Sequence, residues 1–255
     1  MRVALLSDVH ANLTALDAVL AALPAVDELW VMGDTVGYGP DPSEVIARLH
    51  ERGAHLVAGN HDRAVATGEG LELFNPIAAE AAALHRSWLS SDELAVLDRL
   101  PLTLTRERVT FFHGSLRQPL WEYIFDAGVA EATLSISPTP CCVCGHTHVP
   151  ALFQLIDGVT QARAIRVGEI YPLQPGVPSG GGSGVPPGGS MGKLLINPGS
   201  VGQPRDRDPR ASWALLDTET GVTFQRTAYD VGATQRRMRS RHLPDFLIER
   251  LAIGL

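Results

Sequence analysis

Aspartate, asparagine and histidine residues recur at the ends of predicted strands. In chain order the groups are Asp8-Val9-His10, Gly33-Asp34, Gly59-Asn60-His61-Asp62, His113-Gly114 and Gly145-His146-Thr147-His148. Carboxylate, imidazole and amide oxygen suit borderline-hard first-row divalent ions better than thiol-preferring ions. Each group alone is a weak signal, because turns use the same residues. The whole series predicts a site built around metal ions.

The residues around these groups show the alternation of a parallel α/β sheet. Short apolar runs at 1–6, 28–32 and 55–58 predict strands, and apolar residues at helical spacing over 13–23 and 42–52 predict helices between them. In such sheets ligands bind beyond the carboxyl ends of the strands, which is where the polar groups fall. The glycines before Asp34, Asn60 and His146 are expected to let the backbone turn sharply there.

The rest of the chain adds further strands and helices to this pattern. Helices are expected over 74–100, in two parts split near Ser90, over a stretch ending near Ile136, and from Asp230 onward. Strands are expected at 102–105, 108–112, 141–144, 151–156, 160–167, 194–196, 212–217 and 222–229.

Composition is that of a globular protein of 255 residues, long enough to bury a substantial core. The net charge of -7 argues against a general nucleic-acid or membrane-surface binder, which normally carries a basic excess. No apolar run approaches the ~20 residues needed to span a bilayer, and the apolar run before Asp8 is too short for a signal peptide. The expected compartment is the cytoplasm.

Two local features have plain interpretations. Cys141, Cys142 and Cys144 are too closely bunched for a disulfide framework, and we expect them to be small apolar residues of a buried strand. Residues 174–192 are dominated by glycine, proline and serine and predict a flexible loop between two strands. A substrate flap or a self-association element is the alternative for this segment.

The series of polar groups resembles the motifs of the calcineurin-like metallophosphoesterase superfamily. The stretches GDTVGYGPDP, INPGSVGQPRDRDPRASWALLD and LWEY are similar to its bacterial branch of small phosphodiesterases. The resemblance runs from Met1 to about Tyr229, apart from the Gly/Pro-rich insertion. It implies an α/β fold, namely a four-layer αββα sandwich of two stacked mixed β-sheets flanked by helices, in one domain over residues 1–255.

The resemblance also implies a role for each polar residue. The implied ligands are Asp8, His10 and His148 for one metal, Asn60, His113 and His146 for a second, and Asp34 as a bridge between both. His61 would be the general acid beside the leaving-group oxygen. The implied cofactors are two divalent metal ions, with manganese first and iron, zinc, cobalt, nickel or magnesium as alternatives.

The implied activity is hydrolysis of phosphodiesters, with phosphomonoesters as further substrates. A hydroxide shared by the two ions would attack phosphorus in line while His61 protonates the departing oxygen. One alternative is hydrolysis of dinucleoside polyphosphates. Another is a non-catalytic protein-binding scaffold of the same fold, which the complete ligand set disfavours, and a structural zinc protein is weaker because such sites prefer sulfur. The partner would be a small phosphoester or nucleotide, and the chain would be a monomer or a homo-oligomer.

The sequence departs from one branch of the superfamily. Its protein Ser/Thr phosphatases continue the second motif as G-D-x-x-D-R-G, with an Asp supporting the acid histidine and an Arg gripping phosphate. Gly37 and Tyr38 stand at those positions here, which disfavours a protein phosphatase. The partner that orients His61 is therefore open, and Asp62 is equally plausible as that partner and as a solvated loop carboxylate.

An arginine-rich segment follows the turn at 197–200. Arg205, Arg207 or Arg210 could clamp a phosphate with its fork of donors. The alternative is an exposed loop in which Arg and Asp neutralise one another. Arg205 is preferred because it lies nearest the turn.

Overall fold

The computed structural model describes residues 1–173 and 192–255, so the segment at 174–192 lies outside the described residues except for Gly192. The strands are β1 (Arg2–Leu6), β2 (Glu28–Val31), β3 (His55–Leu56), β4 (Thr103–Arg106), β5 (Val109–Phe112), β6 (Cys141–Val143), β7 (Ala151–Ile156), β8 (Val159–Ala162), β9 (Ile170–Tyr171), β10 (Lys193–Asn197), β11 (Ala211–Asp217) and β12 (Gly221–Thr227). The α-helices are α1 (Leu13–Ala22), α2 (Pro42–Glu51), α3 (Asn60–Thr67), α4 (Pro76–Trp88), α5 (Ser91–Asp98), α6 (Ala127–Ile136), α7 (Val231–Ser240) and α8 (Asp245–Arg250), and short 3₁₀ turns are η1 (Leu71–Leu73) and η2 (Leu251–Ile253).

The strands form two mixed sheets of six strands each. One sheet has the order β3-β2-β1-β11-β12-β9, and the other has the order β4-β5-β6-β10-β7-β8. In the first, β1, β2 and β3 run parallel, and in the second β5, β6 and β10 run parallel. The carboxyl ends of these two parallel sets deliver the polar groups to one edge of the molecule.

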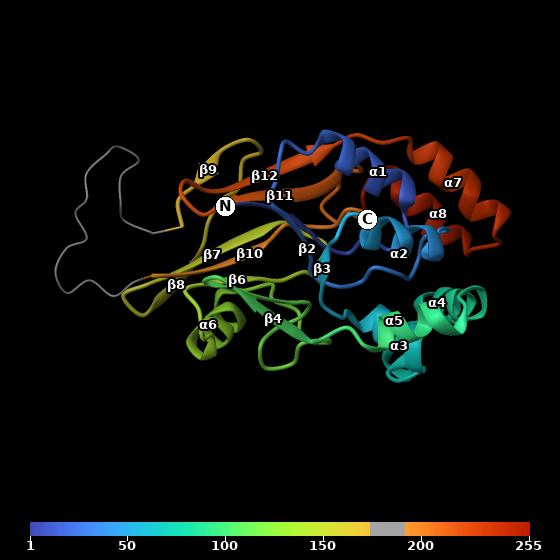
Figure 1. The fold of residues 1–255 in the computed structure, drawn as a ribbon, viewed down its shortest axis with the longest axis horizontal. Helices are drawn as coiled ribbons and strands as arrows, with labels where there is room; N and C mark the ends of the chain where they lie inside the picture. Colours follow the sequence, from blue (N-terminus) through green and yellow to red (C-terminus); the bar gives the residue numbers. More distant parts are fainter. Residues whose placement is uncertain (174–191) are drawn as a thin grey trace.

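Helices cover the two outer faces of the stacked sheets, as Figure 1 shows. Helices α1 and α2 lie over the first sheet, and α6 lies against the second. Helices α3, α4 and α5 lie together at one end of the molecule, below α7 and α8 in this view. The expected αββα sandwich is therefore confirmed.

Strand alternation sorts the core into layers. In β1, Val3 and Leu5 pack into the cluster between the sheets, whereas Ala4 and Leu6 pack against the α1 and α2 layer. This follows from the two-residue period of side-chain direction in a strand. The same alternation separates the three cysteines in and just after β6. Cys141 faces the other sheet, whereas Cys142 and Cys144 face α6. All three are buried free thiols, as expected of apolar strand residues.

One expected element needs correction, and two elements were not expected. The strand predicted at 160–167 ends at Ala162, because the chain then leaves the second sheet and crosses to β9 in the first, where Arg166 N–H donates to the Tyr171 hydroxyl. The two-residue strand β9 gives too short a pattern to predict. Helix α3 was not expected either, and it begins at Asn60 within the third polar group. In the described part of the chain, no helix combines the length and apolar character needed to cross a membrane.

Candidate metal centre

Backbone hydrogen bonds hold the segments after β1 and β2 side by side beyond the ends of the strands. The Asp8 N–H donates to the Gly33 carbonyl at 3.1 Å, and the His10 N–H donates to the Asp34 carbonyl at 2.9 Å. In the second sheet, the Gly145 N–H donates to the His113 carbonyl at 2.8 Å. The polar side chains are thus fixed by continuation of the sheet ladders rather than by free loops.

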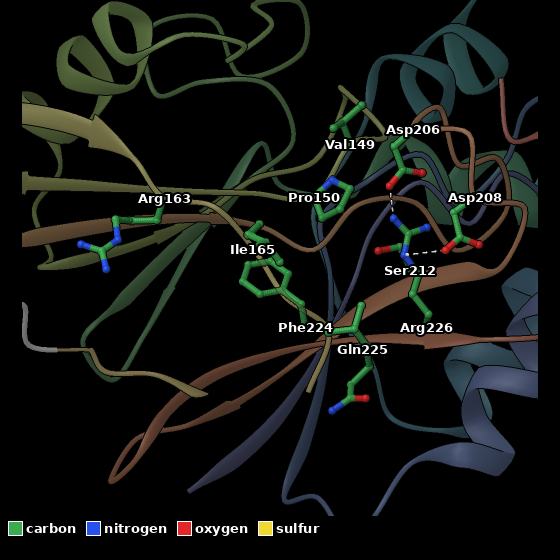
Figure 2. Close-up of a pocket in the computed structure, with 11 residues that line it drawn as sticks. Val149, Pro150, Arg163, Ile165, Asp206, Asp208, Ser212, Phe224, Gln225 and Arg226 are labelled. Atoms are coloured by element: carbon green, nitrogen blue, oxygen red, sulfur yellow. Dashed lines mark hydrogen bonds and ion pairs between the residues drawn. The ribbon is translucent and has the colours of Figure 1, made fainter. Parts of the chain in front are cut away.

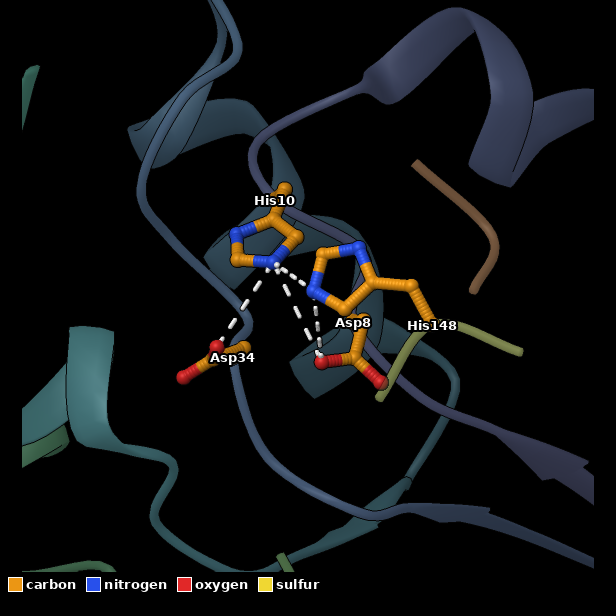
Figure 3. Close-up of side chains that lie close together, drawn as sticks. All are labelled: Asp8, His10, Asp34 and His148. Carbon is orange, nitrogen blue, oxygen red and sulfur yellow. Dashed lines mark hydrogen bonds and ion pairs between the residues drawn. The ribbon is translucent and has the colours of Figure 1, made fainter. Parts of the chain in front are cut away.

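Four of the predicted residues form a first cluster, consisting of Asp8, His10, Asp34 and His148, which Figure 3 shows converging. The Nε2 atoms of His10 and His148 lie 3.1 Å apart. His148 Nε2 lies 3.3 Å from Asp8 Oδ1, and His10 Nε2 lies 3.6 Å from Asp34 Oδ2. All four side chains are buried.

A second cluster shares Asp34 and adds His113 and His146. His113 Nε2 lies 3.4 Å from Asp34 Oδ2 and 2.9 Å from His146 Nδ1. Asn60 Oδ1 completes the group at 3.0 Å from the same Nε2 atom. The seven residues expected to bind metal therefore lie together in the structure, in two clusters with Asp34 common to both.

In both aspartates of the clusters, one carboxylate oxygen accepts hydrogen bonds from the protein and the other faces the histidines. Asp8 Oδ2 accepts from the Ser7 hydroxyl at 2.6 Å and from the His146 N–H at 3.1 Å, while Asp8 Oδ1 is buried without a hydrogen-bond partner among the described residues. Asp34 Oδ1 accepts from the His61 N–H at 2.9 Å. A buried carboxylate oxygen without a donor is costly unless a cation satisfies it.

The four histidines present lone pairs to the clusters, because the other ring nitrogen of each contacts a backbone carbonyl. The pairs are His10 Nδ1 with Val36 O (3.0 Å), His148 Nδ1 with Gln203 O (2.6 Å), His113 Nδ1 with Met32 O (2.8 Å) and His146 Nε2 with Trp121 O (3.3 Å). A carbonyl can only accept, so that nitrogen carries the proton in a neutral ring. The inward nitrogens and the carboxylate oxygens are then all acceptors, and this donor set fits divalent metal ions.

Burial favours the neutral form of both kinds of side chain in the clusters. It raises the pKa of the Asp8 carboxyl to about 7 and raises that of Asp34 well above its usual value. It lowers the pKa of His10, His146 and His148 well below the usual value. A cation placed among these groups would reverse the shift of the carboxyls and keep the imidazoles unprotonated, so the site favours positive charge.

Left-handed backbone conformations bring these side chains inward. Five of the predicted ligands have positive φ, namely Asp8 (51°), His10 (47°), Asp34 (52°), His146 (67°) and His148 (60°). Such conformations cost roughly 1–3 kcal/mol each and concentrate at functional sites. The strain is consistent with selection for the position of the side chain rather than for stability.

The expectation that three glycines provide sharp turns holds at only one position. Gly33 has φ +81° before Asp34. Gly59 and Gly145 do not have a positive φ. Their missing side chains instead make room for neighbouring groups, because a Cβ would lie 2.0 Å from Asp34 Oδ1 at Gly59 and 1.9 Å from Ser7 Oγ at Gly145. Both spaces are occupied by groups of the carboxylate network.

His61 lies beside the first cluster in an aromatic enclosure. Its ring centroid is 4.4 Å from that of Tyr38, 4.5 Å from that of Phe74 and 5.0 Å from that of His10. Its Nδ1 is buried without a hydrogen-bond partner among the described residues, and Gly37 lies so close that a Cβ there would be 2.3 Å from this atom. Burial, reinforced by the Arg205 charge, lowers the pKa of His61.

Asp62 is neither solvated nor directed at His61. It is fully buried, and its Oδ1 accepts from the Val36 N–H while Oδ2 accepts from the Gly59 N–H, each at 3.0 Å. Its role is therefore to cap α3 and to fasten the segment after β2 to the start of that helix. The sequence could not show this, because α3 lacks a strong apolar pattern.

His85 lies outside the clusters and supports the loop beneath His61. Its Nδ1 accepts from the Gly37 N–H at 3.0 Å, and its Nε2 faces the Gly39 carbonyl at 2.7 Å. It is therefore a structural histidine.

We expect His85 to make the free energy of unfolding depend on pH. Burial lowers its pKa to about 4, so between the usual value and about 4 the unfolded chain binds more protons than the folded one. Stability should therefore fall as the pH falls through this window, by roughly 2 kcal/mol at pH 5. Gln can make both hydrogen bonds without titrating, so urea unfolding at pH 7.5 and 5 should show a smaller loss in His85→Gln. An equal loss in both proteins would contradict this assignment.

The arginine-rich segment separates into paired and unpaired residues. Arg210 is exposed and pairs with Asp208. Arg226 of β12 pairs with Asp206, as Figure 2 shows, at the edge of a cavity of about 360 Å³. These pairs match the interpretation of mutually neutralised charges. Arg226 thereby fastens the segment, because it also donates to the Arg210 carbonyl at 3.1 Å.

Arg205 differs from its neighbours by facing the clusters. Its Nη2 donates to Gln203 Oε1 at 3.1 Å and lies 3.5 Å from the Tyr38 hydroxyl, and no carboxylate among the described residues lies within ion-pair distance. Its Nε is buried without a hydrogen-bond partner in the same part of the chain. The guanidinium therefore keeps donor capacity for an anion beside the site.

Sequence reasoning missed two residues that hold the site together. Asn197, at the end of β10, donates to the Gly145 carbonyl at 2.6 Å and to the Thr147 hydroxyl at 3.0 Å, which fixes the turn between His146 and His148. Ser7 holds the outer oxygen of Asp8. Their position at strand ends, next to the ligand groups, is the signal that could have identified them.

Comparisons with known proteins agree with this geometry. The calcineurin-like phosphoesterase superfamily domain matches residues 1–221. A metallophosphoesterase from Sphaerobacter thermophilus has a TM-score of 0.83 and 38% identity, covering 100% of this chain and 99% of that one. An uncharacterized protein of Methanocaldococcus jannaschii is 30% identical over 99% of this chain and 98% of its own. A symmetrical bis(5'-nucleosyl)-tetraphosphatase of Pectobacterium carotovorum is 41% identical over 63 residues, which is 23% of this chain and 22% of that one.

Proposed function

Because this chain belongs to the calcineurin-like phosphoesterase superfamily, we propose that it hydrolyses phosphodiesters at a centre of two divalent metal ions. The observation that carries the proposal is the pair of acceptor clusters sharing Asp34. Asp8, His10 and His148 would hold one ion, and Asn60, His113 and His146 the other. Manganese is our first choice, and iron, zinc, cobalt, nickel and magnesium stay open because oxygen and imidazole donors admit all of these ions. Bound ions would supply Lewis acidity and neutralise charge on the phosphoryl oxygens.

The residues around the clusters have separate tasks in this proposal. Arg205 binds a phosphoryl oxygen with donors that no described carboxylate engages. His61 donates a proton to the leaving-group oxygen, and the negative charge of a bound substrate raises its pKa against the effect of burial. Phe74 and Tyr38 exclude water from the His61 ring. We place the enzyme in the cytoplasm, where its free thiols would stay reduced.

A second candidate is hydrolysis of dinucleoside polyphosphates. Its support is the local similarity to a bis(5'-nucleosyl)-tetraphosphatase over 63 residues. The scaffold alternative has less support, because the family is one of phosphoesterases and the residues that we propose as metal ligands lie together.

The test is a hydrolysis panel on protein stripped of metal and refilled with single ions. It compares an aryl phosphodiester, an aryl phosphomonoester, cyclic nucleotides and a dinucleoside polyphosphate. We expect the aryl diester to be cleaved fastest with manganese. Faster cleavage of the dinucleoside polyphosphate would favour the second candidate, and no turnover with any ion would exclude both.

We expect Arg205→Ala to weaken substrate use without loss of metal. Loss of a charge-assisted hydrogen bond should lower kcat/KM about 10- to 100-fold. Arg210→Ala is the matched control from the same segment, since Arg210 already pairs with Asp208, and its kinetics should stay close to wild type. Unchanged kinetics in Arg205→Ala, or equal losses in both variants, would remove Arg205 from the site.

A further inference from the structure

Two exposed aromatic rings extend outward from a predicted metal ligand. The Tyr123 ring stacks on the His146 imidazole with centroids 3.8 Å apart and planes 14° from parallel. The Phe125 ring lies parallel to Tyr123, at 5.4 Å and 11°. Tyr123 is 43% exposed and Phe125 is 65% exposed, so both offer surface to a ligand at the site.

The segment that carries these rings is held firmly. Ile124, between them, is 3% exposed and packs in the cluster beneath α6, which leaves its two neighbours pointing outward. Upstream, Glu122 accepts from the Ser115 hydroxyl and pairs with Arg117. The segment that carries the rings is thus fixed by packing and hydrogen bonds, which lowers the entropic cost of binding a ligand against them.

The two rings lie beside the metal centre, which favours a role in substrate binding over a chance exposure of aromatic side chains. Among the described residues, the exposed aromatic side chains are Tyr123, Phe125 and Phe246, and two of these three adjoin the metal centre. Burial raises the pKa of the Tyr123 hydroxyl and the charge of Arg205 opposes this shift, so the arginine proposed to bind phosphate lies near the ring stack. A molecule with a phosphate at the clusters would reach the rings with a neighbouring planar group.

We propose that Tyr123 and Phe125 form a stacking subsite for the nucleobase of a nucleotide-containing phosphoester. The inference rests on the proposed function, because the phosphate must occupy the metal centre. Every base has a flat π-face that stacks on aromatic rings largely without regard to sequence. The subsite therefore selects nucleotides as a class and not one particular base.

Phe125 gives the cleaner test, because Tyr123 touches His146. Two diesters with the same p-nitrophenolate leaving group, thymidine 5'-(p-nitrophenyl phosphate) and methyl p-nitrophenyl phosphate, compare a nucleoside with a methyl group. Wild type should prefer the nucleoside ester about 10-fold in kcat/KM. Phe125→Ala should abolish this preference while leaving the methyl ester unaffected, and Phe125→Trp should retain it. Phe246→Ala removes a similarly exposed ring on α8 and should behave as wild type.

A binding measurement separates this inference from the proposed function. Calorimetric titration of metal-loaded protein with AMP and with ribose 5-phosphate compares ligands that differ only in the base. AMP should bind about 10-fold more tightly to wild type and no more tightly to Phe125→Ala. If neither ester is hydrolysed, the proposed function fails and this titration still decides the subsite. Equal binding of the two ligands by wild type, or an unchanged preference in Phe125→Ala, would overturn the inference.

Discussion

Asp34→Asn should lower kcat/KM about 10³-fold or more and should reduce bound metal below that of wild type. Asp34 is the carboxylate common to both clusters, with Oδ2 facing His10 and His113 and Oδ1 accepting from the His61 N–H. The amide of Asn must direct its NH₂ either toward the ions or toward the His61 N–H. One orientation repels the cations and the other breaks the hydrogen bond, so neither restores the site.

The control is a buried aspartate outside the clusters. Asp41 pairs with Arg237, and Asp41→Asn should leave metal content and activity near wild type even if it lowers stability. Metal analysis and activity are measured on the same samples. Full metal content with full activity in Asp34→Asn would show that the shared carboxylate is not a ligand.

The second large effect concerns His61 and depends on the leaving group. His61→Ala should slow hydrolysis of alkyl phosphodiesters by about 10²–10⁴-fold, because a poor leaving group needs a proton as it departs. An activated aryl diester such as the p-nitrophenyl ester should lose much less. Since His61 binds Asp34 through its backbone N–H, the Ala variant keeps that contact and should keep its metal.

The informative measurement is therefore a series of diesters with leaving groups of graded basicity. The dependence of log kcat/KM on leaving-group pKa should steepen in His61→Ala, and wild type should be the less sensitive protein. His85→Gln serves as the control for loss of a buried histidine near the same loop. A uniform loss across the series would indicate that His61 supports the structure and does not supply the proton.

The strands that carry the ligands could be predicted because their signal is local. Apolar runs such as 1–6 and 28–32 end at polar groups, and the rule that parallel strands meet at one edge places those groups together. The short apolar run from Cys141 to Cys144 likewise predicts a buried strand from its local pattern, and β6 with its buried cysteines lies there. What could not be predicted depends on partners distant in the sequence.

Asp62 shows the limit most directly. Its carboxylate accepts a hydrogen bond from the N–H of Val36, which lies 26 positions earlier in the sequence, and no local pattern indicates that contact. Arg205 and Arg210 both lie close to aspartates in the sequence, but only Arg210 has Asp208 placed to neutralise it. The inward direction of the ligands depends on left-handed φ angles at residues such as Asp8, which the residue type permits but does not require.

The central claim is that two ions are held by clusters sharing Asp34. Its most direct test is titration of metal-stripped protein with manganese, in which bound metal and hydrolysis of an aryl phosphodiester are both followed. We expect binding to saturate at two equivalents per chain, with activity rising to its maximum only as the second equivalent binds. Saturation at one equivalent with full activity would contradict the account.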